Sequence, residues 1–243
     1  MRVFSLALLV FGVSVSAFAR GGGGGGGGSM HIGVGLGLIT AGQDDLNSIQ
    51  QRDNAANTIS TPQLGSAYEF SGSFGYRFSG TIYELMFRPS YFWHSATGGT
   101  TGGAPYEYGV KGLMLYPIFR LYPLENAFMK FFFQFGVGYG KLYGTVKENT
   151  YTVEFEGSSF GYLAGLGVEM CMTDSHCFIL EGNLRGSPAE RSLVTSVSGT
   201  QSGAIWGNTS TSVAVGQEIE MDNRDLKITG SGILANIGYV MRF

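Results

Sequence analysis

The sequence predicts an all-β protein, an eight-stranded antiparallel up-and-down transmembrane β-barrel. Three observations support this fold class. The N-terminus carries an export signal, and the rest of the chain lacks the roughly 18 unbroken apolar residues that a transmembrane helix needs. In addition, about eight segments alternate between apolar residues and small or polar ones, with the two-residue period of a β-strand.

The export signal is expected to cover residues 1–19. Met1 and Arg2 form a short positive start, residues 3–15 are largely apolar, and the Ala-Phe-Ala sequence at 17–19 has the small residues that signal peptidase recognises. An N-terminal membrane anchor is the alternative, but the apolar stretch is too short for one. We therefore expect an exported mature chain.

A glycine tract follows the predicted cleavage site, and residues 20–29 are interpreted as a flexible tether. A phosphate-binding loop would also need a Gly-Lys-Ser or Gly-Lys-Thr sequence, which the tract lacks. Residues 30–243 remain as one domain, the outer-membrane barrel.

The composition supports a membrane barrel. Charged residues make up 14% of the chain, aromatic residues another 14%, and there are 40 glycines. In a membrane without long apolar helices, only a closed barrel satisfies every backbone hydrogen bond. The net charge of −3 gives no indication of a nucleic-acid partner.

The alternating segments lie at approximately 31–40, 67–78, 81–94, 108–122, 129–142, 159–172, 177–186 and 226–243. The fourth has the least regular pattern, because residues 113–115 are apolar on both faces and Pro117 lacks a backbone donor. A bulge or register change is expected there.

The connections between these segments alternate in length. The expected long ones are 41–66, 95–107, 143–158 and 187–225, and the short ones are 79–80, 123–127 and 173–176. Short turns at one end and long loops at the other are typical of barrels whose long loops face outside the cell.

The C-terminal segment 232–243 resembles the terminal assembly signal of bacterial outer-membrane proteins, with matching residues Ile237, Tyr239, Met241 and Phe243. The mature chain as a whole resembles the small eight-stranded barrels that include OmpX-like and OmpW-like proteins and the OmpA membrane domain. The resemblance implies a Gram-negative outer-membrane location, recognition by the barrel-assembly machinery, and contact with outer-membrane lipid and lipopolysaccharide. It does not determine the function, because this fold carries adhesins, structural proteins, small pores and lipid A-modifying enzymes.

The polar face of the strands carries charges of both signs that are expected to point into the barrel. These are Glu69, Arg77, Glu84, Arg88, Lys130, Glu169, Glu181 and Arg185. The interior of such a barrel is only wide enough for side chains to fill it. We therefore expect an ion-paired plug, with a narrow conducting path as the alternative.

Aromatic residues near the predicted strand ends are expected to face lipid as two girdles at the headgroup levels. They are Tyr76, Phe78, Tyr83, Tyr91, Trp93, Tyr108, Tyr239 and Phe243. Ordinary packing in a soluble β-sandwich is the alternative.

Cys171 and Cys177 flank a predicted short turn and would face each other across a hairpin, which suits a disulfide. A metal site that adds His176 is the alternative, but three ligands crowded on one turn without a fourth make a poor one. No metal or cofactor is expected.

The sequence gives no indication of an enzyme. His94 and Ser95 lie at a predicted outer strand end, where a lipid A esterase of this fold would hold its triad, but neither has an evident carboxylate partner. His31 and His176 are isolated.

The last long loop is the strongest functional indication. Residues 212–221 alternate in polarity, so the seventh and eighth strands are expected to continue as a hairpin above the membrane, with Trp206 near its tip. Residues 187–225 would then bind a surface ligand, or would only shield the barrel mouth. We expect a structural or adhesin-like surface-interaction role; the alternatives are a narrow channel for small or apolar solutes and, less favoured, a lipid A-modifying enzyme.

Overall fold

The computed structural model describes residues 28–100, 103–200, 206–207 and 213–243. The predicted signal peptide and residues 20–27 of the predicted tether lie outside these ranges. The first strand begins at Ser29, so the barrel starts one residue earlier than expected.

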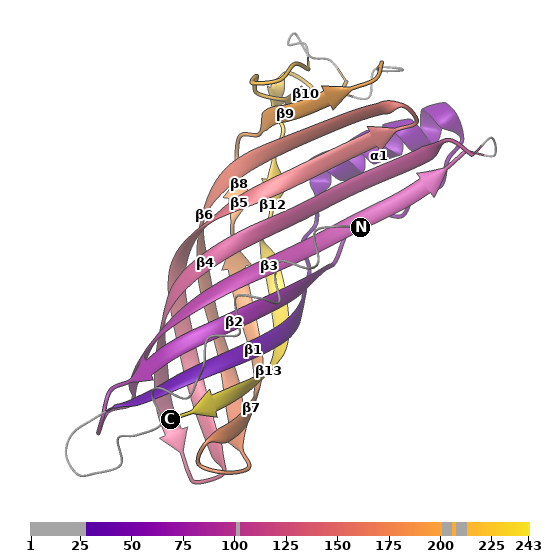
Figure 1. Ribbon diagram of the computed structural model, residues 1–243. Helices are drawn as coiled ribbons and strands as arrows, with labels where there is room; N and C mark the ends of the chain where they lie inside the picture. The colour runs from indigo at the N-terminus through magenta and orange to yellow at the C-terminus, as the bar shows by residue number, and fades with distance from the viewer. Residues whose placement is uncertain (1–27, 101–102, 201–205, 208–212) are drawn as a thin grey trace.

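The fold is a closed antiparallel barrel, and the predicted fold class is confirmed (Figure 1). The chain forms neighbouring strands in order, and pairing of the first strand with the last, from His31 opposite Arg242 to Ile39 opposite Leu234, closes the ring. The ring strands are β1 (Ser29–Ile39), β2 (Ala67–Arg77), β3 (Tyr83–Gly99), β4 (Pro105–Glu125), β5 (Met129–Glu148), β6 (Tyr151–Cys171), β7 (His176–Gly186) and β13 (Gly232–Arg242).

Smaller elements gather at the end with the long connections. They are helix α1 (Asp44–Asn57) and the short strands β8 (Pro188–Ala189), β9 (Leu193–Ser198), β10 (Glu220–Met221), β11 (Arg224–Asp225) and β12 (Ile228–Thr229). Within the described ranges, no helix is long and apolar enough to cross a membrane.

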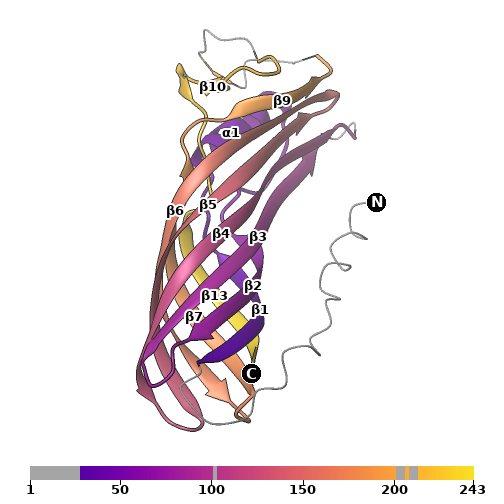
Figure 2. The ribbon, with the colours of Figure 1, turned by 60° about the vertical axis from the view of Figure 1, so that its left-hand side comes forward.

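The ring strands differ in length. β1, β2, β7 and β13 have 11 residues each, whereas β3 to β6 have 17 to 21. Since about 9–11 tilted residues suffice to cross a bilayer, the four long strands continue well beyond it. Figure 2 shows these strands rising past the others on one side of the barrel. We call this part, residues 94–99, 105–112, 141–148 and 151–158 together with β9, the outer extension.

The expected register change near Pro117 is wrong. Pro117 lies opposite Phe87, and the β4–β5 ladder omits Tyr116 and Pro117 but resumes in the same register. A single missing donor therefore interrupts the ladder without displacing it. The register shift lies instead between Leu121 and Leu124, close to the short turn.

Helix α1 was not expected in the loop 41–66. Its buried face contains only two large apolar residues, Leu46 and Ile49, followed one turn later by the buried Asp53. Two acidic residues in the first turn suit the helix dipole, and Thr58 in the left-handed conformation ends the helix. Leu46 and Ile49 pack in the same buried cluster as residues of the outer extension.

The predicted hairpin of the last loop is also wrong. β7 ends at Gly186 and β13 begins at Gly232, so neither strand continues outward. The chain between them folds back over the barrel: β8 pairs with β12, β10 with β11, and β9 with the outer half of β6. Trp206 is only 2% exposed, instead of lying at an open tip.

Candidate functional site: the barrel interior and its outer cap

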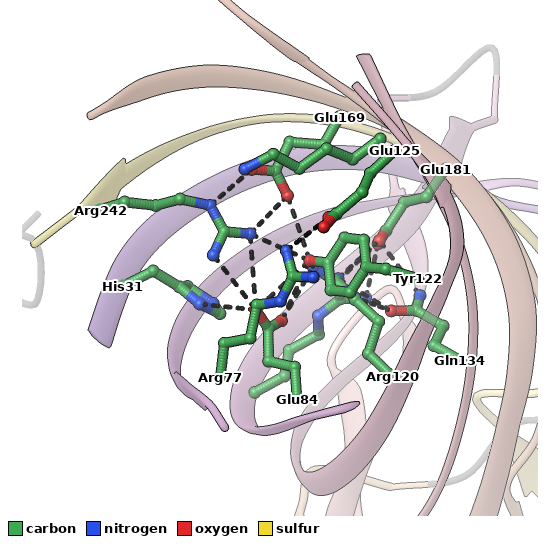
Figure 3. Close-up of polar contacts among 12 residues, drawn as sticks. His31, Arg77, Glu84, Arg120, Tyr122, Glu125, Gln134, Glu169, Glu181 and Arg242 are labelled. Carbon is green, nitrogen blue, oxygen red and sulfur yellow. Dashed lines mark hydrogen bonds and ion pairs between the residues drawn. The ribbon is translucent and has the colours of Figure 1, made fainter. Parts of the chain in front are cut away.

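The lower part of the barrel interior holds a network of charged side chains (Figure 3). Glu84 lies near its centre, with its carboxylate 3.4 Å from both Arg120 and Arg242 and 3.3 Å from Nδ1 of His31. Arg242 also forms two short hydrogen bonds to Glu169, at 2.6 and 2.7 Å. The strands bring these groups together because alternate residues of every strand point inward.

A second centre of the network is Glu181. Arg88 donates a hydrogen bond to one carboxylate oxygen at 2.9 Å and forms an ion pair with the other at 2.6 Å, and Gln134 and Asn236 each donate at 3.1 Å. Arg120 is fully buried and connects this centre to Glu84. A buried carboxylate without a partner would be strongly unfavourable. These contacts therefore give the buried carboxylates of Glu84 and Glu181 the cationic partners that they need inside the plug.

A third ion pair lies nearer the outer end of the ring. Arg185 pairs with Glu69 and donates to the carbonyl oxygen of Gly230 at 2.6 Å. Its guanidinium lies 5.2 Å from the centre of the Phe92 ring. Arg185 thus marks the boundary between the charged network and the apolar upper interior.

Above that boundary the interior is filled by apolar and aromatic side chains. Residues exposed by 2% or less include Phe92, Met114, Tyr116, Leu142, Leu163 and Leu234. In the charged part, the space beside Arg88, Arg120 and Asn236 measures about 20 Å³, roughly the room for one water molecule. The described side chains thus occupy both halves of the interior.

The short-turn end of the barrel has a wider opening. A depression of about 390 Å³ lies there, lined in part by Arg77, Lys130 and Arg242. Arg77 pairs with Glu125 at 2.7 Å. Lys130 is 4.0 Å from Glu169, which is a loose ion pair. The mouth is open, but it leads to the plug.

The outer end is covered by a cap, which we define as residues 43–66, which include α1, with residues 187–192 and 213–230. Asp45 receives two hydrogen bonds from Arg224, at 2.9 and 2.5 Å, and the side chain of Gln43 bonds to the backbone of Thr229 at both its oxygen and its nitrogen. Asn47 likewise bonds to both backbone groups of Leu64. The cap is therefore tied together by specific polar contacts.

The cap contains one buried acidic pair, beyond the membrane band. Asp53 of α1 accepts a hydrogen bond from the hydroxyl of Tyr108, and Glu148 of β5 lies beside it. Burial, with the neighbouring Asp53 carboxylate, raises the pKa of Glu148 to about 9. Burial also raises the pKa of Asp53. No ion pair to either carboxyl is found within the described part of the chain. The pair therefore holds a proton at neutral pH.

The eight charged residues expected in the interior all lie on the inward side of the strands. Six of them are buried: Glu69, Glu84, Arg88, Glu169, Glu181 and Arg185. Arg77 and Lys130 lie at the mouth. The sequence interpretation missed His31, Arg120, Tyr122, Gln134 and Arg242, which complete the network. Inward strand parity was a sufficient signal for His31, Gln134 and Arg242, whereas Arg120 and Tyr122 lie in the segment whose two faces are hardest to tell apart by sequence.

One residue of the expected aromatic girdles is misplaced. Tyr108 is fully buried and points inward, toward α1. The reason is parity, since Leu113 and Leu115 face outward and place even-numbered residues of this part of β4 inside. Of the others, Phe78, Tyr83, Tyr91, Trp93 and Phe243 are 41–43% exposed, while Tyr76 and Tyr239 are half-buried.

Cys171 and Cys177 are opposite each other in the β6–β7 register and are joined by a disulfide. Glu169 lies close to both sulfurs. Because bonded cysteines do not act as thiolate ligands, this group does not form a metal site. His176 contacts Tyr239 instead.

The outer surface of the ring is apolar over the height of the short strands. Its exposed side chains include Val34, Leu36, Phe70, Phe87, Leu115, Phe133, Phe135, Phe160, Leu166, Leu180, Leu184 and Ile237. A continuous apolar surface of this kind needs lipid or a partner to cover it. A charged interior inside an apolar outer band defines a transmembrane barrel. The chain is a bacterial outer-membrane β-barrel.

Sequence comparison adds no family: no family model matches the chain, and no curated protein matches it. Solved structures do resemble it. The outer membrane protein OprG from Pseudomonas aeruginosa is 13% identical, with a TM-score of 0.55, over 90% of this chain and 98% of that one. A major outer membrane protein from Thermus thermophilus is 10% identical, with a TM-score of 0.54, over 88% and 99%. At these identities the likeness supports the fold.

Proposed function

We propose that this protein is a non-conducting outer-membrane barrel with a structural and surface-interaction role. The observation that carries the proposal is the filled interior. Glu84, Glu169 and Glu181 each contact at least one guanidinium, the upper interior is apolar, and the cap covers the outer end. Ions crossing this interior would have to displace several buried ion pairs at once.

The outer extension supports the surface-interaction part of the proposal. Above the apolar band its outward face changes to polar side chains in cross-strand rows, with Glu107 opposite Lys147 and Thr145 opposite Glu154. Lys141 and Glu156 form an exposed ion pair at 2.9 Å. A broad polar face with charges of both signs suits contact with another macromolecule more than contact with lipid acyl chains.

The enzyme alternative has less support. Consecutive strand residues point to opposite faces of a sheet, so His94 and Ser95 of β3 are directed apart. No described carboxylate forms an ion pair with His94. Mass spectrometry of lipid A from cells with and without the gene should show identical spectra, and a lost acyl chain would support the enzyme instead.

Two measurements test the proposal. The folded chain in planar bilayers should give no conductance, and stable single-channel steps that heat-denatured protein does not produce would overturn the plug. Cells that display the chain should be retained on surfaces coated with a protein of mixed surface charge, more strongly than cells without it.

The variant for the second measurement changes only the outward face: Lys147→Ser with Glu154→Ser. Both side chains point away from the cap, so the variant should fold and retention should fall. Equal retention of cells with and without the chain would overturn the surface-interaction part.

A further inference from the structure

A depression of about 200 Å³ lies on the outward face of β3, β4 and β5, just above the apolar band. It is centred on Gly109, which is opposite Ser95 on one side and Thr145 on the other. The row below consists of Trp93, Lys111 and Tyr143. The side chains of these residues other than Gly109 point away from the barrel interior, so the depression opens on the outer surface and belongs to neither the plug nor the cap. His94 and Val110, whose side chains have inward parity, also line it.

The depression exists because Gly109 has no side chain, and the backbone does not require a glycine there. Its φ is not in the left-handed region, and an added Cβ would meet only the carbonyl oxygen of His94 at 3.6 Å and the Cβ of Ser95 at 4.0 Å. These are ordinary contact distances. A larger residue would therefore fill the depression without strain, which makes the depression removable by one substitution.

Lys111 supplies a positive charge at the lower edge. It is exposed, and none of the ion pairs within the described ranges includes it, whereas Lys141 is paired with Glu156. Its Nζ lies 6.0 Å from the centre of the Tyr143 ring. An exposed ammonium without a carboxylate partner is available to an anionic ligand.

The position of the depression relative to the apolar band indicates which part of the membrane a bound ligand would occupy. One step below it on the same face are Tyr91 and Leu113, both exposed apolar side chains of the band, at 41% and 49%. One step above are Thr97 and Glu107. The depression therefore lies at the level of lipid headgroups, and the acyl chains of a bound lipid would run along the band below it.

We propose that this depression binds the phosphorylated glucosamine head of lipopolysaccharide. Lys111 would pair with a phosphate, and the rings of Trp93 and Tyr143 offer flat faces for a sugar ring. The hydroxyls of Ser95 and Thr145 and the carboxylate of Glu107 supply hydrogen bonds for sugar hydroxyl and amide groups. The charge, the hydroxyls and the continuity with the lipid-facing band all match this one occupant.

Native mass spectrometry of the full chain in detergent, titrated with purified rough-type lipopolysaccharide, tests the site. Lys111→Gln should weaken binding about tenfold or more, since it removes a charge-assisted contact. Gly109→Val should weaken it similarly by filling the depression. Lys147→Gln is the matched control, because that lysine is on the same face but does not line the depression. Each variant's fold is checked by the gel shift between boiled and unboiled samples.

Two further lipids distinguish recognition of the lipopolysaccharide phosphate from attraction to any anionic lipid. Dephosphorylated lipid A should bind the native chain as weakly as intact lipopolysaccharide binds the Lys111→Gln variant, and phosphatidylglycerol should compete poorly. The proposal is overturned if folded Lys111→Gln and Gly109→Val bind as the native chain does. The proposal is also overturned if Lys147→Gln weakens lipopolysaccharide binding as much as Lys111→Gln does, or if phosphatidylglycerol displaces lipopolysaccharide completely. Either result indicates general attraction between charges.

Discussion

The substitution Glu148→Gln should stabilise the docking of α1 at neutral pH and remove most of its pH dependence. In the folded chain the Glu148 carboxyl has a pKa of about 9, against 4.5 for a solvated glutamate. At pH 7 the docked cap therefore holds a proton that the undocked cap releases. At about 1.4 kcal/mol for each pH unit above 4.5, this opposes docking by roughly 3 kcal/mol.

The sign follows from the raised pKa. The contribution of this group to docking is complete below pH 4.5, falls as the pH rises toward 9, and changes no further above 9. Glutamine has nearly the same shape and no proton to lose, so the variant should show little of this dependence. At pH 7 its cap should open up to roughly a hundredfold less often.

Native-state hydrogen exchange of the α1 amides, in lipid nanodiscs between pH 5 and pH 8, measures this opening once intrinsic exchange rates are divided out. In the native chain, protection should fall with each pH unit by up to about tenfold. Glu154→Gln, an exposed carboxylate on the same hairpin, is the matched control and should keep the slope. An unchanged slope in the Glu148→Gln variant, or a less protected helix at pH 7, would refute the reasoning.

Three further predictions concern stability in detergent or lipid. Arg120→Met removes the buried guanidinium that joins Glu84 to Glu181 and should lower the free energy of unfolding in urea by about 3–5 kcal/mol; a loss under 1 kcal/mol would show that the network does not need this residue. Phe133→Arg places a charge on the apolar band and should destabilise by about 2–4 kcal/mol in lipid vesicles, whereas Thr145→Arg on the outer extension should change little; equal effects would contradict the position of the band. Replacing Cys171 and Cys177 by serine removes the disulfide and should lower the free energy of unfolding by about 2 kcal/mol, because the loop that it closes is short. Urea unfolding of the variant and of the oxidised native chain measures this difference, and equal stability would contradict a stabilising role of the disulfide.

The barrel was predictable because alternation is a local property. Each segment such as 129–142 shows its two faces without reference to its neighbours, and the interior charges follow from the same parity. Arg120 was missed because it lies in the one segment where both faces are apolar. Tyr108 was misassigned there for the same reason: its parity had to be read from Leu113, whose neighbour Met114 is equally apolar.

The cap was not predictable from local pattern. Helix α1 has only Leu46 and Ile49 to mark its buried face, because the other buried residues of the helix, Asp45, Gln50 and Asp53, are polar. The last loop has an alternating sequence, but its residues are used against α1 and the outer extension instead of in a long hairpin. Ile219 and Met221, for example, are each 1% exposed, within the buried cluster that also contains Leu46 and Ile49. Tertiary contacts, which the local sequence pattern does not reveal, determine the structures of both segments.

The polar contacts of the cap join the two ends of the chain. Asp45 and Arg224 are separated by 179 residues, and Gln43 and Thr229 by 186. Such long-range contacts have a high loop-closure cost until β1 and β13 have met. We therefore expect the cap to form only after the ring has closed, so that an intact cap indicates a closed ring. A surface probe that recognises the intact cap would count only fully assembled molecules, even in a membrane that also contains incomplete ones.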